Sequence, residues 1–243
     1  MSDSLPPHVS IVVPVYNEAG ACADLAREIA AAFAGLPHEI LFVDDASRDD
    51  TRAILVALKA DLPTLRVLAH GANSGQSRAL RTGVLAATGG IVVTLDGDGQ
   101  NDPADAPGLV RHLSEGPATL ALVGGERVKR QDTAAKRIAS RLANGIRKRL
   151  LNDQANDTGC GLKVFRRDAF LRLPYFDHMH RYLPALMIRE GYQVAFAPVG
   201  HRPRTTGASK YTNLQRLWAA LSDLTGVMWL NRRARLPEPV TEL

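Results

Sequence analysis

Short runs of consecutive apolar residues alternate with longer stretches of helical spacing through the first half of this 243-residue chain. The runs predict four strands, over Val9–Val15, Glu39–Asp44, Thr64–Ala69 and Ile91–Asp96. All but the third are apolar almost throughout, which is typical of parallel strands covered on both faces. The stretches between them predict three helices, over Glu18–Ala34, Asp50–Ala60 and Gly75–Ala87. This alternation predicts an α/β, doubly wound, mostly parallel sheet with helices on both faces, and ligands outside the carboxyl ends of its strands.

The second half of the chain is less regular. It predicts further strands at Leu120–Gly124, Gly161–Arg166 and Gln193–Pro198, and helices at Thr133–Leu151 and Thr212–Leu230. The length suits one folded domain, which we place at residues 1–236 with a loose tail at 237–243.

The net charge of +5 is unevenly distributed along the chain. Asp and Glu outnumber Lys and Arg before residue 127, and the reverse holds after it. Such a division suggests carboxylates for a cation in one half and basic groups for an anionic partner in the other. Nucleic acid is disfavoured as that partner, because aromatic residues make up only 5% of the chain. A dehydrogenase and a P-loop NTPase are disfavoured because their glycine-rich patterns are missing.

Signals of the cellular compartment are few. The two cysteines, Cys22 and Cys160, fit neither a disulfide framework nor a metal site by their spacing. The N-terminal residues do not read as a signal peptide, and no run of about 18 uninterrupted apolar residues occurs. These features predict a cytoplasmic protein without a membrane span.

The strongest chemical signal is the segment Asp96-Gly97-Asp98-Gly99-Gln100 at the end of the fourth predicted strand. Two carboxylates two residues apart, with glycines between them, can point several oxygens at one Mg²⁺ or Mn²⁺ ion shared with a substrate phosphate. The alternative is a polar surface turn, since Asp-Gly is a common turn dipeptide. Four histidines lack metal-ligand spacing and are interpreted as structural or surface residues: His70, His178, His180 and His201.

Acidic residues also follow the first two predicted strands. Asp44 and Asp45 end the second strand, where they can accept hydrogen bonds from a nucleotide base or ribose. The alternative reading of this segment is that Ser47, Asp49 or Asp50 caps the next helix. Glu18, after the first strand, suits either a ligand contact or the favourable field at a helix start.

Four segments in the first half together resemble the family 2 glycosyltransferases of the GT-A fold: VSIVVPVYNE, EILFVDDASRDDT, NSGQSRALRTG and IVVTLDGDGQNDP. Four in the second half resemble the polyprenyl-phosphate sugar synthases, the branch similar to dolichol-phosphate mannosyltransferase: GER from Gly125, SRLAN from Ser140, DTGCGLK from Asp157 and RTTGASKY from Arg204. The resemblance covers about residues 9–211. It implies a nucleotide and metal half at 9–126, an acceptor half at 127–211 and an amphipathic interfacial helix at 212–236.

The resemblance implies a role for each matching residue. Those implied to contact the nucleotide donor are Pro14, Tyr16, Glu18, Asp44, Asp45 and Asp96. The implied metal ligands are Asp96, Asp98 and Gln100. The implied ligands of the acceptor phosphate are Arg127, Arg141, Arg204, Ser209 and Lys210. Asp98, Arg127 and Arg204 are the implied catalytic residues.

This sequence departs from the family at three places. The family's common VDDGS is VDDAS here, its GF pattern after the Asp157 motif is Cys160-Gly161-Leu162, and the C-terminal membrane hairpin of many bacterial members is not found. The last departure leaves open how the protein meets a lipid.

The resemblance implies an inverting, metal-dependent transfer of a sugar from a nucleotide-diphosphate sugar, UDP being favoured over GDP, to a polyprenyl phosphate. Chemistry supports a phosphate acceptor, because a phosphate monoester is already a nucleophile at neutral pH whereas a hydroxyl requires a general base. Two alternatives remain: transfer to a saccharide hydroxyl in polysaccharide or glycolipid assembly, and a non-catalytic protein that binds sugar nucleotides.

Two amphipathic stretches suggest how such a chain reaches its lipid. Thr133–Leu151 spaces Ile138, Leu142, Ile146 and Leu150 four apart among basic residues that include Arg147. Thr212–Leu230 carries Trp218 and Trp229 on an apolar stripe, with arginines after it. Basic amphipathic helices with tryptophan bind anionic bilayers, which predicts a peripheral protein at the inner face of the cytoplasmic membrane. Alternatively, the stripes pack on the core or on a membrane-embedded partner subunit.

Overall fold

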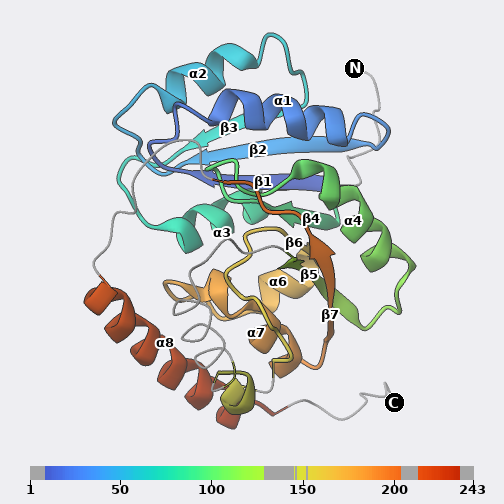
Figure 1. Cartoon of the computed structure of the whole chain (residues 1–243), viewed down its shortest axis with the longest axis vertical. Coiled ribbons are helices and arrows are strands. Elements are labelled where there is room, and N and C mark those ends of the chain that lie inside the picture. The colour runs from blue at the N-terminus through green and yellow to red at the C-terminus, as the bar shows by residue number, and fades with distance from the viewer. Residues whose placement is uncertain (1–8, 129–144, 146, 152, 204–212, 236–243) are drawn as a thin grey trace, which may run out of the picture.

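The computed structural model describes residues 9–128, 145, 147–151, 153–203 and 213–235 (Figure 1). Within them the chain forms a seven-stranded sheet of order β3-β2-β1-β4-β6-β5-β7. The strands are β1 (Val9–Val15), β2 (His38–Asp44), β3 (Leu65–Ala69), β4 (Ile91–Thr94), β5 (Leu120–Arg127), β6 (Lys163–Arg166) and β7 (Gln193–Val199). The predicted strands are confirmed, with bounds shifted by no more than a few residues.

Six strands of this sheet run in the same direction. β6 alone runs the other way, because it pairs antiparallel with both β4 and β5. The predicted α/β and mostly parallel character is therefore confirmed. The carboxyl ends of β1, β2, β4 and β5 lie at one edge of the sheet, together with the first residue of β6, Lys163.

Helices cover both faces of the sheet. They are α1 (Cys22–Ala32), α2 (Thr51–Leu58), α3 (Gln76–Ala86), α4 (Ala106–Glu115), α6 (Arg167–Arg172), α7 (Leu183–Arg189) and α8 (Asn213–Arg233), with short 3₁₀ turns η1 (Pro103–Asp105) and η2 (Met179–Arg181). Helix α4 was not predicted; it carries a proline and a glycine in its first turn, where the proline is tolerated.

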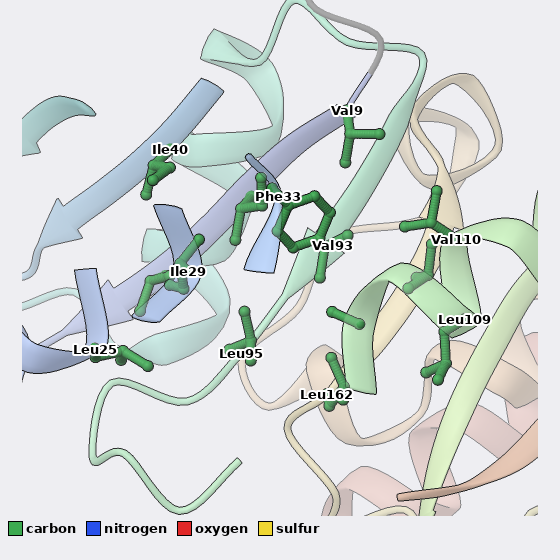
Figure 2. Packing of buried hydrophobic residues seen from close by; sticks show 14 of the residues in the cluster. Val9, Leu25, Ile29, Phe33, Ile40, Val93, Leu95, Leu109, Val110 and Leu162 are labelled. Atoms are coloured by element: carbon green, nitrogen blue, oxygen red, sulfur yellow. The ribbon is translucent and has the colours of Figure 1, made fainter. Parts of the chain in front are cut away.

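The alternating strand residues divide the core into two layers. One layer packs α1, α2 and α4 against alternate residues of β1, β2 and β4. Figure 2 shows Leu25 and Ile29 of α1, and Phe33 just after it, in the same cluster as Val9 and Ile40 of the strands. The other layer packs α3, α6, α7 and part of α8 against the opposite face. Burial on both faces explains why β1, β2 and β4 are apolar almost throughout.

The predicted apolar stripe of helix α8 is partly packed on the core and partly exposed. Leu224, Val227 and Met228 pack against the layer that contains α7. Leu221 is 47% exposed and Trp229 is 63% exposed. The side chain of Trp218 lies outside the described residues. Part of the stripe therefore packs on the core, as one of the alternatives held, and part of it faces outward.

The other amphipathic stretch is described only at its end. Residues 147–151 are helical. Leu151 is buried there, whereas Leu150, a member of the predicted apolar stripe, is exposed. Arg147 is also buried, because its guanidinium pairs with Asp153 Oδ2 at 3.1 Å and donates to the Ala155 carbonyl at 2.6 Å. The prediction that Arg147 serves an anionic surface is therefore wrong.

None of the helices within the described ranges has both the length and the apolar character needed to cross a bilayer.

Candidate active site

The predicted ligand-binding edge lies where the strand order reverses. From β1 the chain proceeds outward through β2 and β3, then returns to place β4 on the other side of β1. A doubly wound sheet has its ligand crevice at such a point. The segments after β1, β2 and β4 all reach this edge, and they carry Tyr16, Asp45 and Asp96 respectively.

The turn after β4 is as tight as its glycines suggested. A Cβ on Gly97 would lie 2.6 Å from Val15 Cγ1 and 2.9 Å from the Pro14 carbonyl oxygen, so only glycine allows this approach to β1. Gly99 has φ = 73°, a conformation that favours glycine. The turn therefore holds Asp96 and Asp98 directly beside the end of β1.

Asp96 is held from two sides. Gln76 Nε2, at the start of α3, donates to Asp96 Oδ1 at 2.8 Å. On the other side a Cβ on Gly161 would overlap the carboxylate, so this glycine lets Asp96 lie against the backbone. Burial raises the pKa of Asp96, and the charge of Asp98 raises it further, while Lys163, Gln76 and Arg127 partly offset the rise.

Asp98 and Gln100 complete the turn. Asp98 Oδ1 accepts from the Gln100 backbone N at 3.1 Å, and in the described part of the chain no donor reaches Oδ2. The Gln100 carbonyl accepts from Arg202 N at 2.9 Å.

The donor set fits a divalent cation. Among the described residues no group of three or more His, Cys, Asp and Glu is placed to hold a metal ion. Two neighbouring carboxylates, one with a free oxygen, match the way Mg²⁺ is bound through one or two carboxylates and substrate phosphates. A cation would also relieve the repulsion between Asp96 and Asp98.

Asp44 and Asp45 are already engaged by protein donors. Asp44 is fully buried and accepts from Arg52 Nε at 2.7 Å and from Ser47 N at 3.0 Å. Asp45 accepts from His70 Nδ1 at 2.7 Å and from two backbone N–H groups of the loop before α3. These bonds shape the site, and the implied contacts to a nucleotide stay predictions.

Hydrogen bonds join the loop after β1 to the loop after β2. Asn17 N donates to Ser47 Oγ at 2.9 Å, and the Asn17 side chain accepts from Arg48 N at 2.7 Å. Glu18 N donates to Thr51 Oγ1 at 2.8 Å. Asp49, one of the predicted caps, accepts from Thr51 N at 3.1 Å, whereas the side chain of Asp50 makes no cap bond.

The other residues implied to contact the nucleotide donor lie in β1 and in the loop that follows it. Pro14 is buried in β1, and Tyr16 and Glu18 are half-buried just beyond the strand. Their implied roles at the base and ribose are untested by this geometry, although their position at the ligand-binding edge agrees with those roles.

On the acceptor side Arg127 is bound to a carboxylate. Arg127 Nε and Nη2 donate to the two oxygens of Asp157 at 2.6 and 2.7 Å, which is a bidentate pair. The hydrogen bond to Asp157 raises the pKa of Arg127 despite its burial. The other implied phosphate ligands, Arg141, Arg204, Ser209 and Lys210, lie outside the described residues.

The family is shown by comparison with known sequences. The model of glycosyl transferase family 2 matches residues 10–173, more than half of the chain. This chain belongs to that family.

Curated relatives refine the family assignment. The glycosyltransferase is 32% identical over 236 residues to the dodecaprenyl-phosphate galacturonate synthase of Rhizobium johnstonii, covering 94% of this chain and 69% of that protein. It is 37% identical over 224 residues to an undecaprenyl-phosphate 4-deoxy-4-formamido-L-arabinose transferase of Pseudomonas syringae, covering 90% and 65%. The resemblance to polyprenyl-phosphate sugar synthases is confirmed. The chain spans about two thirds of the length of these relatives.

Solved structures establish the fold of the glycosyltransferase. Mannosyl-3-phosphoglycerate synthase from Rubrobacter xylanophilus aligns with a TM-score of 0.70 at 19% identity, covering 97% of this chain and 79% of that one. Glucosyl-3-phosphoglycerate synthase from Mycobacterium tuberculosis, in complex with Mn²⁺, UDP and glucosyl-3-phosphoglycerate, aligns with 0.69 at 20%, covering 96% and 81%. The predicted GT-A fold is confirmed.

Three residues of the glycosyltransferase site were not assigned a role from sequence. Gln76 contacts Asp96, and its only signal was its place in the NSGQS segment. Lys163 is buried beside the site, where its ammonium donates to the Cys160 carbonyl and burial lowers its pKa. His180 is bonded to Ser77 Oγ at 2.7 Å through Nδ1, and burial lowers its pKa well below 6.5, so it is neutral.

Proposed function

We propose that this glycosyltransferase transfers a sugar from a nucleotide-diphosphate sugar to a polyprenyl phosphate, giving a lipid-linked monosaccharide. The observation that carries the proposal is the pair Asp96 and Asp98 at the crevice of the sheet. The names of two relatives, which cite dodecaprenyl and undecaprenyl phosphate, support the acceptor class.

The cation in this proposal is Mg²⁺ or Mn²⁺. Asp96 and Asp98 would hold it, with Gln100 as a further ligand, and Pro14, Tyr16, Glu18, Asp44 and Asp45 would surround the nucleotide. When bound, the ion offsets negative charge that develops on the departing diphosphate. The Mn²⁺ and UDP in the mycobacterial neighbour support this assignment and favour UDP over GDP.

The pair of Arg127 with Asp157 is consistent with a phosphate acceptor. A sugar hydroxyl needs a general base, and Asp157 is unsuited to that role while both of its oxygens accept from Arg127. A phosphate monoester needs positioning and charge compensation instead. We assign this task to Arg127, Arg141, Arg204, Ser209 and Lys210.

The transfer is proposed to invert the anomeric centre. A phosphate oxygen of the acceptor attacks the anomeric carbon from the face opposite the nucleotide. The new carbon–oxygen bond forms as the bond to the diphosphate oxygen breaks, and the nucleoside diphosphate leaves with the electron pair. No proton has to be removed from the acceptor in this step.

Mass spectrometry of the lipid product tests the proposal. The protein is incubated with undecaprenyl phosphate, Mn²⁺ and a panel of UDP- and GDP-sugars, and the lipid fraction is analysed for a mass increase of one sugar residue. We expect an acid-labile sugar phosphate from at least one donor. Transfer to an oligosaccharide and not to the lipid would favour the saccharide alternative, and donor binding without transfer would favour a binding protein.

The proposed site of action is the inner face of the cytoplasmic membrane. Trp229 and Leu221 of α8 are exposed, and Arg232, Arg233 and Arg235 are exposed at or beyond its end. An apolar face followed by basic residues suits an anionic bilayer. A membrane-embedded partner subunit that covers the same face is the alternative occupant.

Liposome binding tests the membrane contact. Trp229→Ser should weaken binding to anionic liposomes about tenfold, because it removes one large apolar contact. Val56→Ser is the matched control, since Val56 is also exposed but lies on α2, on the other face of the sheet. Equal binding by the native protein and Trp229→Ser would exclude Trp229 as the anchor, and binding by neither would favour the partner subunit.

A further inference from the structure

We propose that Gln76 is a positioning residue of the cation site, which fixes the Asp96 carboxylate for the metal ion, and that Asp45 acts through Gln76 by anchoring the loop before α3. The inference rests on the proposed function, because it assumes that Asp96 binds a divalent cation. It assigns a task to a residue whose contact was not expected from the sequence.

The inference begins from the contact between Gln76 and Asp96. Gln76 is exposed on the first turn of α3, yet its amide nitrogen donates to Asp96 Oδ1 at 2.8 Å. Gly161 supports the other side of the carboxylate. The bond and the contact with Gly161 together fix the orientation of the Asp96 carboxylate, whose charge is felt by Asp98.

The loop before α3 fixes the position of Gln76 itself. The loop before α3 places Gly75 at φ = 86°, which favours glycine. Ser74 N donates to Asp45 Oδ1 and Gly75 N to Asp45 Oδ2, each at 2.8 Å. The carboxylate of Asp45 therefore fixes the two residues that immediately precede Gln76.

Asp45 is in turn held in place by His70. Asp45 is buried, and its Oδ1 also accepts from His70 Nδ1 at 2.7 Å. The other ring nitrogen of His70 accepts from the Thr82 hydroxyl at 2.9 Å. Asp45 is thereby joined to the end of β3 and to the second turn of α3. A continuous set of hydrogen bonds links this buried group with the metal-binding carboxylate.

The binding of UDP, measured by calorimetry with Mn²⁺ and again with chelator, tests the proposal. Gln76→Met keeps the length of the side chain and removes the donor. We expect its affinity for UDP in Mn²⁺ to fall about tenfold, the loss expected for a hydrogen bond to a charged group. We expect no change in chelator, because Gln76 acts on the metal ligand and not on the nucleotide. A merely structural role would change both values.

Asp45→Asn tests the second link. The variant should weaken UDP binding more in Mn²⁺ than in chelator, where any loss reports the nucleotide contact proposed for Asp45. The additional loss in Mn²⁺ should not grow when Gln76→Met is added, because both substitutions act on one contact. Additive losses of the gain from Mn²⁺ in the double variant, or equal losses in Mn²⁺ and in chelator, would overturn the role of Asp45. The exposed position of Gln76 keeps its own variant informative even if Asp45→Asn does not fold.

Two controls separate the possible failures. Ser74→Ala keeps the backbone donor to Asp45 and removes only a hydroxyl that donates to the Ala72 carbonyl, so its UDP affinities should match the native values. If Mn²⁺ does not strengthen UDP binding to the native protein, the metal role and this inference both fail. If Asp98→Asn abolishes the gain from Mn²⁺ while Gln76→Met retains it, the inference alone is overturned.

Discussion

Two carboxylates at opposite edges of the same sheet have opposite environments. Glu39, at the start of β2, accepts from Ser10 Oγ, Thr88 N and Thr88 Oγ1, each at 2.7 Å, and from Arg66. Burial opposes its ionisation, but these hydrogen bonds outweigh that effect and lower the pKa of Glu39. Asp96, at the other edge, receives one side-chain hydrogen bond and faces a second carboxylate, and its pKa is raised.

We interpret the difference as one between a group that serves the fold and a group that serves the proposed ligand. Glu39 joins the starts of β1 and β3 to the segment before β4, and its charge is fully compensated within the protein. Asp96 carries a charge that the protein compensates only in part, which agrees with the cation that we propose for this site. A carboxylate whose pKa is raised by burial and by a neighbouring charge is found often at functional sites.

The largest expected effect is on turnover, at the ligand edge. Asp98→Asn should lower the rate of sugar transfer about 10²–10³-fold, because one charge that holds the cation is lost. A chelator should have the same effect on the native protein, and Mn²⁺ should restore the rate. Full activity in excess chelator would contradict the metal role. The rate is measured as lipid product formed with time.

The next effect is on stability, at the opposite edge. Glu39→Gln should lower the free energy of unfolding by about 3 kcal/mol, because it breaks the pair with Arg66 and turns an amide toward the donors of Ser10 and Thr88. Urea denaturation measures it. Glu39→Asp is a useful comparison, since the charge remains but the reach is shorter. A loss below about 1 kcal/mol would show that Glu39 is not a structural centre.

Low pH should remove the same contribution of Glu39 to the free energy of unfolding. The folded pKa of Glu39 lies below its ordinary value of 4.5, so its stabilisation is complete above that pH and is lost as the pH falls through the folded pKa. The native protein should therefore lose more stability below pH 4.5 than Glu39→Gln does. Parallel losses in the two proteins would mean that other carboxylates dominate acid unfolding.

At the ligand edge the corresponding substitution, Asp96→Asn, should change stability in the opposite direction from Glu39→Gln. The raised pKa of Asp96 means that folding disfavours its charged form at neutral pH. Asp96→Asn should then raise the melting temperature in the absence of metal, although it lowers turnover. A clear fall in melting temperature would show that Asp96 is a structural residue like Glu39.

The smallest effect concerns the departure from VDDGS. Ala46 occupies the glycine position and has φ = 62°, in the left-handed region. A non-glycine residue there costs about 1–2 kcal/mol, of which the greater freedom of unfolded glycine cancels about half. Ala46→Gly should stabilise the protein by about 0.5–1 kcal/mol, read from urea denaturation. Destabilisation would show that the Ala46 methyl makes contacts worth more than the strain.

Much of the fold followed from local sequence patterns. The strands at Val9, Glu39 and Ile91 were found because burial on both faces makes them continuous apolar runs. The turn at Asp96 was found because its glycines and carboxylates are adjacent in sequence. The antiparallel insertion of β6 between β4 and β5 was not predicted, since pairing between distant segments leaves no local pattern.

The partners of the site residues were the part that sequence did not reveal. The Gln76–Asp96 and Arg127–Asp157 contacts join residues 20 and 30 positions apart on different elements. The family resemblance marked Arg127 as a phosphate ligand, but a sequence motif does not show that a carboxylate already pairs with the guanidinium. The same holds for Arg147, which looked like a surface residue and is buried beside Asp153.

Measuring turnover and unfolding on the same preparations distinguishes the proposed roles of Asp98 and Glu39. Native protein, Asp98→Asn and Glu39→Gln are each assayed for lipid-linked sugar at a temperature where all three are folded, and each is unfolded in urea without metal. We expect Asp98→Asn to lose turnover at native stability, and Glu39→Gln to lose stability and keep most of its turnover. Loss of both properties in both variants would contradict the division of roles between the two edges of the sheet.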